Sequence, residues 1–351
     1  MAKVAIIGAS MGGLSAAISA ASNGANVTVY DRKSNIRDFY GGEIWPALYD
    51  HHIPAGAQYA ADNFVFYVNK THYVKLPPET IYMLDRDIYQ EALAKKASSL
   101  GCKILLSTPA MVSKLRHQYD VIIDASGYPS CSLGEYGIGR VKEIATALYY
   151  ISSGDFSWCH KDLHMWWLPK KTLGYFWIFP KNNGTKANIG IGWVHDHINQ
   201  SWKPPTFKDI DDFLHKLNIK QTVSDKGGHV VPLVPLKQLR YENVLLVGDA
   251  AGLMNSTLAA GNHLAAESGR IAGLCAAINK LDSYEHRIKD SIGPELRNSQ
   301  ILYNLQKRLS FNDFDEYFPI LNKVGPDIFF TRQKLIEAGI RFLGAKLGLW
   351  S

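Results

Sequence analysis

Hydrophobic and polar positions near the N-terminus change their period twice. Residues 4–7 form a short apolar run, residues 14–22 carry small and apolar side chains at helical spacing, and residues 27–30 form a second apolar run. A short apolar run bounded by turn residues is typical of a buried strand, whereas a longer stretch with helical period is typical of a helix. The pattern therefore predicts a strand, a helix and a strand, which make a βαβ unit.

Strand and helix patterns alternate along the rest of the chain. In order, they predict a strand at 81–84, a helix at 85–100, a strand at 121–125, a strand at 243–248, a helix at 264–278 and mainly helices after residue 281. Residues 143–193 differ, because they are rich in Tyr, Trp, Phe and Ile and are interrupted by turn signals. This composition predicts an antiparallel sheet as a separate layer.

Composition is that of an ordinary globular protein. The 351 residues are 46% hydrophobic and 20% charged. At roughly 150 residues per domain, this length predicts two domains, or one domain with an insertion. The net charge of +6 is spread along the chain, which argues against nucleic acid as a partner. No apolar stretch approaches the ~20 residues that span a bilayer, and the first strand runs into a glycine turn without a signal-peptide cleavage pattern.

Cysteine and histidine spacing gives no indication of a metal site. The four cysteines are Cys102, Cys131, Cys159 and Cys275. They form no CxxC pair, so they predict neither zinc binding nor a disulfide framework, and they favour a reducing, cytoplasmic setting. His51, His52, His164 and His195 also lack a metal-binding spacing, so we expect no metal.

A glycine-rich turn, GASMGG at residues 8–13, joins the first strand to the first helix. Gly8 can form the tight turn, Gly13 lets the helix approach the sheet, and the helix N-terminus favours a phosphate. Asp31, which ends the second strand, can accept hydrogen bonds from both ribose hydroxyls. A structural βαβ turn is the alternative. Since strand, turn, helix and acidic residue occur in the expected order, we favour a dinucleotide site, with Ser10 in place of the middle glycine.

A second motif, VLLVGDAAG at residues 244–252, predicts a strand that runs into Gly248 and Asp249 and then into the start of a helix. Asp249 can bind a ribityl hydroxyl, and the first N–H groups of that helix would face the polar end of a cofactor. An Asp that only caps a helix is the alternative. Two dinucleotide-contacting elements far apart in sequence favour FAD over NAD.

Further motifs carry a family resemblance. Arg86 heads its predicted helix, and the sequence DASG at residues 124–127 follows a strand. With the two glycine motifs, they resemble the flavoprotein hydroxylase superfamily, in which these four elements surround FAD. Residues 248–272 and the aromatic run YFWIFP at residues 175–180 resemble more narrowly the geranylgeranyl reductase family, and the resemblance covers most of residues 1–280.

The resemblance implies an FAD-dependent oxidoreductase that acts on CH–CH groups and reduces isolated double bonds of polyprenyl chains. The residues that it implies for FAD binding are Gly8, Ser10, Gly12, Gly13, Asp31, Arg32, Gly42, Arg86, Asp124, Gly127, Gly248, Asp249, Gly252, Gly261 and Asn262. It also implies an α/β fold with a Rossmann-type FAD-binding domain, an antiparallel β-sheet substrate domain and C-terminal helices. The expected boundaries are 1–50, 81–130 and 240–280 for the FAD-binding domain, 51–80 and 131–239 for the substrate domain, and 281–351 for the helical region.

The aromatic run also has a reading of its own. In a strand, Tyr175, Trp177 and Phe179 lie on one face, and Phe176 and Ile178 lie on the other. In the resembling family this motif lines the prenyl cavity beside the flavin ring, so Tyr175 and Trp177 are the candidate catalytic residues, with Tyr175 as the candidate proton donor. Packing of these rings in the core is the alternative.

Other functions stay open at this point. A flavin monooxygenase or halogenase is one, because flavin halogenases carry a similar aromatic run, and a non-catalytic FAD-binding protein is another. The expected partner of a reductase is a polyprenyl lipid. Because no second nucleotide-binding motif is visible, the electron donor could be NAD(P)H that binds transiently or a ferredoxin-type protein.

The last residues predict an amphipathic helix with basic side chains. The apolar positions are Ile336, Ile340, Leu343 and Leu347, and the basic ones are Arg332, Lys334, Arg341 and Lys346. Such a helix can lie on a lipid surface or pack on the protein's own core. We therefore expect a cytoplasmic protein, with peripheral contact to the membrane as an open alternative.

Overall fold

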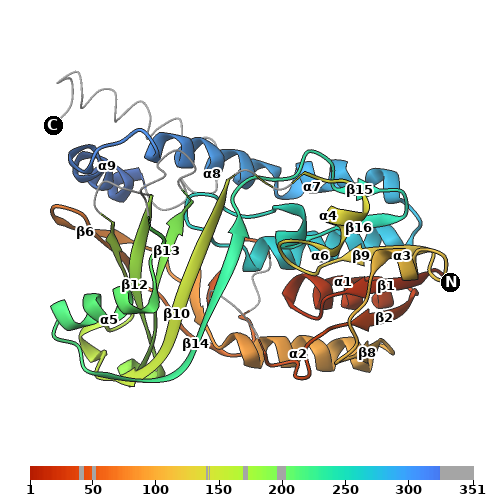
Figure 1. The fold of residues 1–351 in the computed structure, drawn as a ribbon, viewed down its shortest axis with the longest axis horizontal. Helices are drawn as coiled ribbons and strands as arrows, with labels where there is room; N and C mark the ends of the chain where they lie inside the picture. Colours follow the sequence, from red (N-terminus) through yellow and green to blue (C-terminus); the bar gives the residue numbers. More distant parts are fainter. Residues whose placement is uncertain are drawn as a thin grey trace.

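Three β-sheets organise the part of the chain that the structure describes (Figure 1). The computed structural model describes residues 1–38, 43–49, 53–139, 141, 143–168, 173–195 and 203–324. The first sheet has the order β15 (Arg240–Tyr241), β16 (Val244–Leu246), β9 (Val121–Asp124), β1 (Lys3–Ile7), β2 (Asn26–Tyr30) and β8 (Lys103–Leu105). The second has the order β14 (Gln221–Pro232), β10 (Ile144–Gly154), β13 (Lys186–Val194), β12 (Gly174–Lys181), β11 (Leu163–Trp167), β5 (Asn63–Tyr67) and β6 (Thr71–Lys75). The third has the order β3 (Ile44–Pro46), β7 (Ile81–Leu84) and β4 (Ala57–Ala60).

Helices cover these sheets and follow them in sequence. They are α1 (Met11–Ser22), α2 (Arg86–Ser99), α3 (Val112–Leu115), α4 (Cys131–Glu135), α5 (Phe207–Lys216), α6 (Asn262–Ala277), α7 (Tyr284–Ser291), α8 (Gly293–Gln306) and α9 (Phe311–Val324). The 3₁₀ turns are η1 (Ser157–Cys159), η2 (Asn182–Gly184), η3 (Gly248–Ala251) and η4 (Leu281–Ser283).

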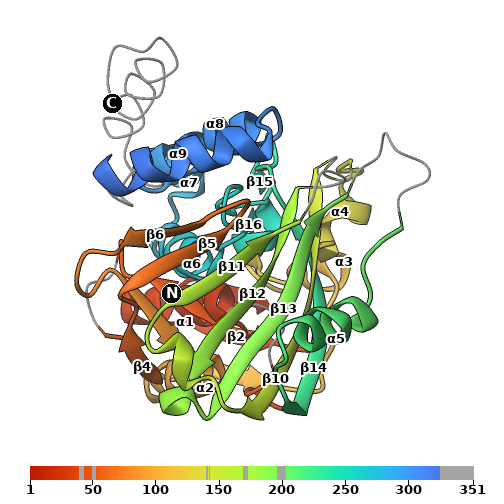
Figure 2. The same cartoon turned by 90° about the vertical axis from the view of Figure 1, so that its left-hand side faces the viewer.

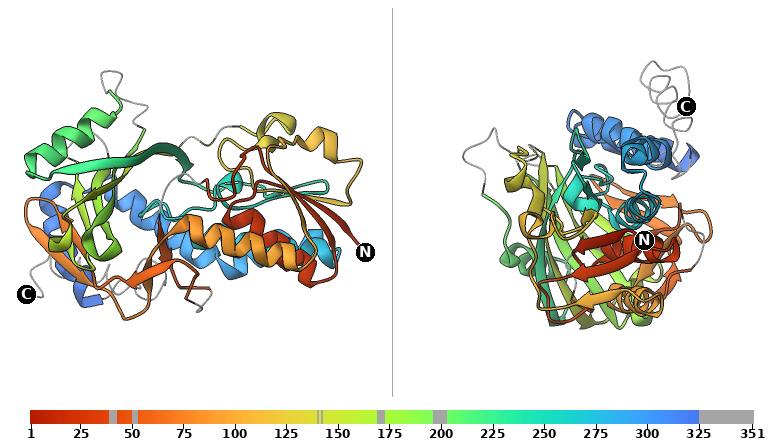
Figure 3. Two further views of the ribbon diagram at one scale, coloured as in Figure 1. Left: turned by 90° about the horizontal axis from the view of Figure 1, so that it is seen from below. Right: turned by 90° about the vertical axis from the view of Figure 1, so that its right-hand side faces the viewer.

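The six-stranded sheet is the Rossmann core. Strand β1 pairs in parallel with β2 and with β9, and its apolar residues are buried because helices cover the sheet. Helices α1 and α6 cross closely: a Cβ added to Gly269 would meet Gly12 O at 2.1 Å, and one added to Gly273 would meet Ala16 O at 2.3 Å. The small residues of α6 therefore allow it to lie directly on α1, and Figure 3 shows these helices beside the sheet.

The seven-stranded sheet forms the second layer, beside the Rossmann core (Figure 2). Its strands β10 to β14 are antiparallel, and β5 joins β11 in parallel. Helix α5 covers one face, where Ile210 and Phe213 pack with Phe176 and Ile178. The opposite face carries Tyr175 and the other alternate aromatic residues, and it turns toward the Rossmann core.

Helices α7, α8 and α9 close the molecule on one side, with α8 running over both layers (Figure 1). Helix α9 packs on β6, where Phe318 stacks on Phe66 with ring centroids 4.3 Å apart and Asp315 pairs with His72 at 2.7 Å. No helix within the described ranges is long and apolar enough to cross a membrane.

The predicted fold class is confirmed, because a parallel Rossmann sheet, an antiparallel sheet and C-terminal helices are all present. The exact domain boundaries stay a prediction. One local prediction is wrong: no helix begins directly after Asp249. A single 3₁₀ turn follows, because Gly252 adopts a left-handed conformation with φ of 71°, and the next helix, α6, begins at Asn262. The expected amphipathic helix of residues 332–347 lies outside the described residues.

Candidate active site

A pocket of about 530 Å³ lies between the Rossmann core and the seven-stranded sheet, and both contribute to its lining. This size is in the usual range for cofactor and ligand sites. The predicted site residues that line it are Gly8, Ser10, Gly12, Asp31, Arg32, Arg86, Gly127, Tyr175, Trp177, Gly248, Asp249, Gly261 and Asn262. The structure thus brings the glycine motifs and the aromatic run, which are far apart in sequence, to one pocket.

The first glycine motif forms one end of this pocket. Gly8 has φ of 107°, and a Cβ there would lie 2.3 Å from Ala125 O, so only glycine fits the turn. A Cβ on Gly13 would lie 1.8 Å from Gly8 O. Gly13 therefore serves the close approach of helix and strand and does not line the pocket, whereas Gly12 does. This cradle of backbone at the N-terminus of α1 fits a pyrophosphate group.

Asp31 and Arg32 lie beside this turn at the end of β2. The Asp31 carboxylate is buried and accepts hydrogen bonds from the backbone N–H of Ala9 at 2.6 Å and of Lys33 at 2.8 Å. These contacts fix the carboxylate at the wall of the pocket, where it can also accept from a ribose hydroxyl.

Arg86 and Ser10 meet across the pocket wall. Arg86 Nη2 donates to Ser10 Oγ at 3.0 Å, and Ser10 Oγ donates to Gln90 Oε1 at 3.1 Å. Burial lowers the pKa of Arg86, and the nearby carboxylates of Asp249 and Glu43 oppose that shift. A buried guanidinium at the first residue of α2 can neutralise an anionic cofactor.

Two predicted residues hold loops and do not line the pocket. The buried Asp124 carboxylate accepts from the backbone N–H and the hydroxyl of both Ser126 and Ser132, at 2.5 to 3.0 Å. It therefore fixes the turn in which Gly127 lies. Gly252 is needed for backbone space, because a Cβ there would lie 2.3 Å from Val234 O.

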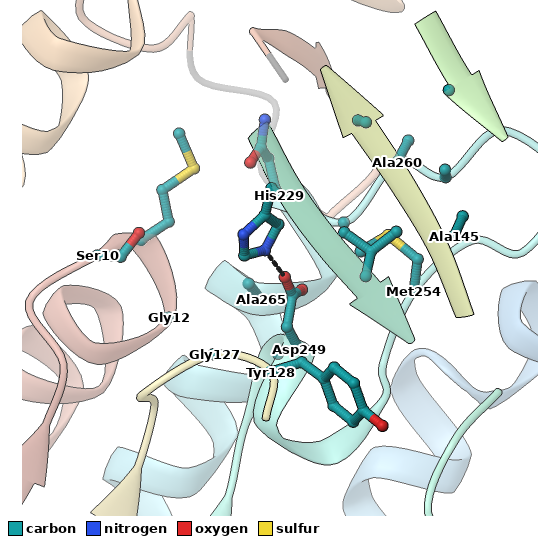
Figure 4. A pocket seen from close by; sticks show the side chains of 18 of the residues that line it. Ser10, Gly12, Gly127, Tyr128, Ala145, His229, Asp249, Met254, Ala260 and Ala265 are labelled. Atoms are coloured by element: carbon teal, nitrogen blue, oxygen red, sulfur yellow. Dashed lines mark hydrogen bonds and ion pairs between the residues drawn. The ribbon is translucent and has the colours of Figure 1, made fainter. Parts of the chain in front are cut away.

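Asp249 faces the pocket and pairs with a residue that the sequence did not single out. His229, on β14, lies with Nε2 3.0 Å from Asp249 Oδ2 (Figure 4). Figure 4 places this pair between the Ser10–Gly12 turn and the side chains of Met254 and Ala145. The pair links the antiparallel sheet to the second glycine motif. A single histidine in a strand gives no sequence signal for such a contact.

The N-terminus of α6 supplies the last predicted cofactor residues. Gly261 is the N-cap, and a Cβ there would lie 3.4 Å from Asp249 Oδ1 and closer to Met254, so the backbone approaches the second motif. Asn262 Nδ2 donates to Ile44 O at 3.1 Å. Because this helix begins at the pocket, its N–H groups are directed to it, which replaces the helix start expected after Asp249.

The aromatic run forms the apolar wall of the pocket. Tyr175, Trp177 and Phe179 share the face toward the pocket, while Phe176 and Ile178 pack on the α5 side, as the alternation predicted. The Tyr175 hydroxyl donates to Leu258 O at 3.0 Å, and burial raises the pKa of Tyr175 to about 12. Its proton is thus held by a carbonyl, which makes Tyr175 a weak candidate for the proton donor.

A buried polar network adjoins this wall, and apart from Trp177 none of its members was predicted from the sequence. Trp177 Nε1 donates to Asn188 Oδ1 at 2.8 Å, and Asn188 Nδ2 donates to Glu43 Oε2 at 2.8 Å. Lys181 Nζ lies 2.5 Å from Glu43 Oε1 and 2.8 Å from Asp85 Oδ1. Burial raises the pKa of Glu43, opposed by Lys181 and Asn188. Glu43 follows Gly41 and Gly42 directly, which was the one available hint.

Gly42, His51 and His52 lie outside the described residues. His164 Nδ1 lies 2.9 Å from Tyr67 OH, and His195 Nε2 lies 2.6 Å from Thr146 Oγ1, so these two histidines have different partners. Among the described residues, no group of His, Cys, Asp and Glu side chains has the arrangement of a metal site.

No family model matches this chain. A digeranylgeranylglycerophospholipid reductase 2 of Methanococcoides burtonii is 28% identical over 378 residues, which cover 95% of this chain and 90% of the relative. A solved structure of a geranylgeranyl bacteriochlorophyll reductase-like protein from Thermoplasma acidophilum superposes with a TM-score of 0.78 at 21% identity, over 96% and 95% of the two chains. A flavin-dependent halogenase superposes with a TM-score of 0.64 at 15% identity, over 98% of this chain and 77% of the other.

The fold defines the class of protein as one with a Rossmann-type sheet, an antiparallel sheet and C-terminal helices. The relatives by sequence and the neighbour by structure confirm the resemblance to the geranylgeranyl reductase family. They also support FAD as the cofactor and an oxidoreductase as the class of enzyme.

Proposed function

We propose that this protein is an FAD-dependent reductase that saturates isolated double bonds of polyprenyl lipid chains. One observation carries the proposal: a single pocket has a dinucleotide-binding end, formed by Gly8, Gly12 and Asp31, and an aromatic wall that includes Tyr175 and Trp177. The relative from Methanococcoides burtonii adds support, because its name describes a reductase of a geranylgeranyl lipid.

Each part of the pocket has a task in this proposal. Bound FAD, once reduced, would supply the hydride. The Gly8–Gly12 turn and the N-termini of α1 and α6 would hold its phosphates and the polar edge of its ring, while Asp31 and Asp249 would hold hydroxyl groups. The aromatic wall would fix an apolar chain and shield it from bulk water. The electron donor, NAD(P)H or a ferredoxin-type protein, and a peripheral contact with the membrane stay predictions.

Anaerobic reduction of the FAD-loaded protein, followed by addition of a geranylgeranyl lipid, tests the proposal. We expect the lipid to reoxidise the flavin without oxygen, and mass spectrometry to show a product heavier by two hydrogens for each saturated bond. A product that forms only with oxygen would mark a monooxygenase or halogenase instead. If neither reaction occurs, the result indicates a non-catalytic FAD-binding protein, which the same pocket also allows.

The proposed role of Asp31 gives a separate test of the cofactor. Replacing Asp31 with alanine should weaken FAD binding by about 1–3 kcal/mol, because charged hydrogen bonds to the ribose are lost. Equilibrium dialysis or fluorescence titration with FAD measures this change.

Asp120→Ala is the matched control for this test, since Asp120 also accepts from a backbone N–H, that of Lys3 at 2.8 Å, but lies at the start of β9. Equal FAD affinity of the two variants would contradict the assignment of Asp31.

A further inference from the structure

The hydrogen bonds of the polar network beside the aromatic wall lead to the Glu43 carboxylate. The Trp177 indole N–H donates to the side-chain oxygen of Asn188. The Asn188 amide and the Lys181 ammonium then donate to the two carboxylate oxygens of Glu43. Glu43 accepts at both oxygens, which is the arrangement expected of an ionised carboxylate beside Lys181. Asn188 is fixed in orientation for the same reason, because its amide must donate to Glu43 and accept from Trp177.

Burial makes this arrangement costly unless every member is satisfied. The Glu43 and Lys181 side chains are 1% and 7% exposed, and Asn188 is buried as well. Lys181 also pairs with Asp85, which caps helix α2 just before Arg86. The network therefore ties the aromatic strand β12 to both β13 and the start of α2. Through Asn188 it connects the Trp177 indole to the Glu43 carboxylate.

Trp177 lines the pocket together with two members of this network, Glu43 and Asn188. A Cβ added to Gly190 on β13 would lie 2.2 Å from Trp177 Cζ2, so the indole occupies the space above a residue that has no side chain. Other parts of the ring line the pocket. An indole is the aromatic group that best attracts a cation, and this attraction is strongest where water is excluded. Donation of its N–H toward a carboxylate through Asn188 increases the electron density of the ring.

The reaction proposed above has a cationic stage. Saturation of one double bond would add a proton to the less substituted carbon and a hydride to the more substituted carbon. A water molecule, which leaves as hydroxide, would give the proton, and reduced FAD would give the hydride. Two C–H bonds replace the π bond, and the flavin loses two electrons. Since the more substituted carbon develops positive charge before the hydride arrives, a group that stabilises this charge lowers the barrier.

We infer that Glu43 is a positioning residue that, through Asn188, holds the indole of Trp177 so that its ring stabilises positive charge on the prenyl carbon. The inference rests on the proposed function and assigns to its aromatic wall an electrostatic task in addition to gripping the chain.

Binding of two substrate analogues to the FAD-loaded protein tests the inference without turnover. One analogue carries a trialkylammonium group in place of the more substituted carbon, and the other is the neutral hydrocarbon of the same shape. We expect the parental protein to bind the ammonium analogue on the order of tenfold more tightly. Glu43→Gln should lose most of this preference and should lower kcat with little change in KM, because the charge is present only in the transition state.

Glu295→Gln is the matched control. Glu295 is another buried carboxylate with an amide and an imidazole as partners, Asn255 and His263, both at 2.9 Å, but it does not line the pocket. This control should retain the preference for the ammonium analogue. If Glu43→Gln does not fold, Trp177→Phe takes its place, because it keeps an aromatic ring and removes the N–H donor. Trp177→Phe should weaken the preference for the ammonium analogue whether or not Glu43→Gln folds.

Each outcome has one meaning. If neither analogue binds, the proposed function fails. If the neutral analogue binds and the ammonium analogue shows no preference, the inference is overturned while the proposed function stands. The inference is also overturned if the preference survives unchanged in Glu43→Gln or in Trp177→Phe.

Discussion

Replacing Trp177 with alanine is expected to lower turnover of a long prenyl substrate by on the order of a hundredfold while FAD stays bound. The indole lines the pocket and is fixed by Asn188, so its loss allows the double bond to shift relative to the flavin. A misplacement of about 1 Å can cost this much in rate. Single-turnover reoxidation of the reduced flavin by the lipid measures the effect, and the visible spectrum reports retained FAD.

Loss of a large ring also costs stability, which the experiment must separate from loss of positioning. A buried Trp→Ala change can cost about 3–5 kcal/mol through the cavity that it leaves. Trp166→Ala is a suitable control, because Trp166 lies on the adjacent strand β11 but on the α5 side of the sheet, with its ring 5.2 Å from that of Phe213. If both variants remain folded and yellow and lose turnover equally, the aromatic wall has no specific role in catalysis.

The parts of this molecule that the sequence predicted best are those fixed by local rules. The βαβ unit follows from apolar period and glycine placement, and β1, α1 and β2 begin and end within three residues of their predicted bounds. The alternation of Tyr175, Trp177 and Phe179 likewise depends only on strand geometry, and their shared face follows once β12 is a strand.

What the sequence could not predict depends on contacts between distant segments. Glu43 and Lys181 are 138 residues apart, and His229 reaches Asp249 from another sheet. Neither pair has a spacing or motif that marks it, since a charged residue in a strand is usually exposed. The prediction of a helix start after Asp249 was wrong for a related reason. Small residues suit a helix, but the left-handed Gly252, which approaches Val234 O, ends it.

The glycines of β13 give the sharpest test of how the indole is held. Gly190→Ala is expected to abolish most prenyl turnover, by a hundredfold or more, because the new Cβ would lie 2.2 Å from Trp177 Cζ2 and 2.4 Å from Leu148 O. Either the ring or the strand must move, and overpacking of this kind costs about 1–3 kcal/mol of stability. The measurements are turnover of a geranylgeranyl lipid and thermal unfolding.

Gly192→Ala on the same strand should have a much smaller effect, of a few-fold at most, because its Cβ would make an ordinary contact of 3.6 Å with the same ring. A double-mutant cycle separates the ring from the strand. In a Trp177→Phe background the smaller ring no longer fills the space above Gly190, so Gly190→Ala should cost less turnover there than in the parental protein. Additive losses would mean that the clash with Leu148 O alone disturbs the strand, and equal losses in Gly190→Ala and Gly192→Ala would mean that Trp177 is not held by close approach to β13.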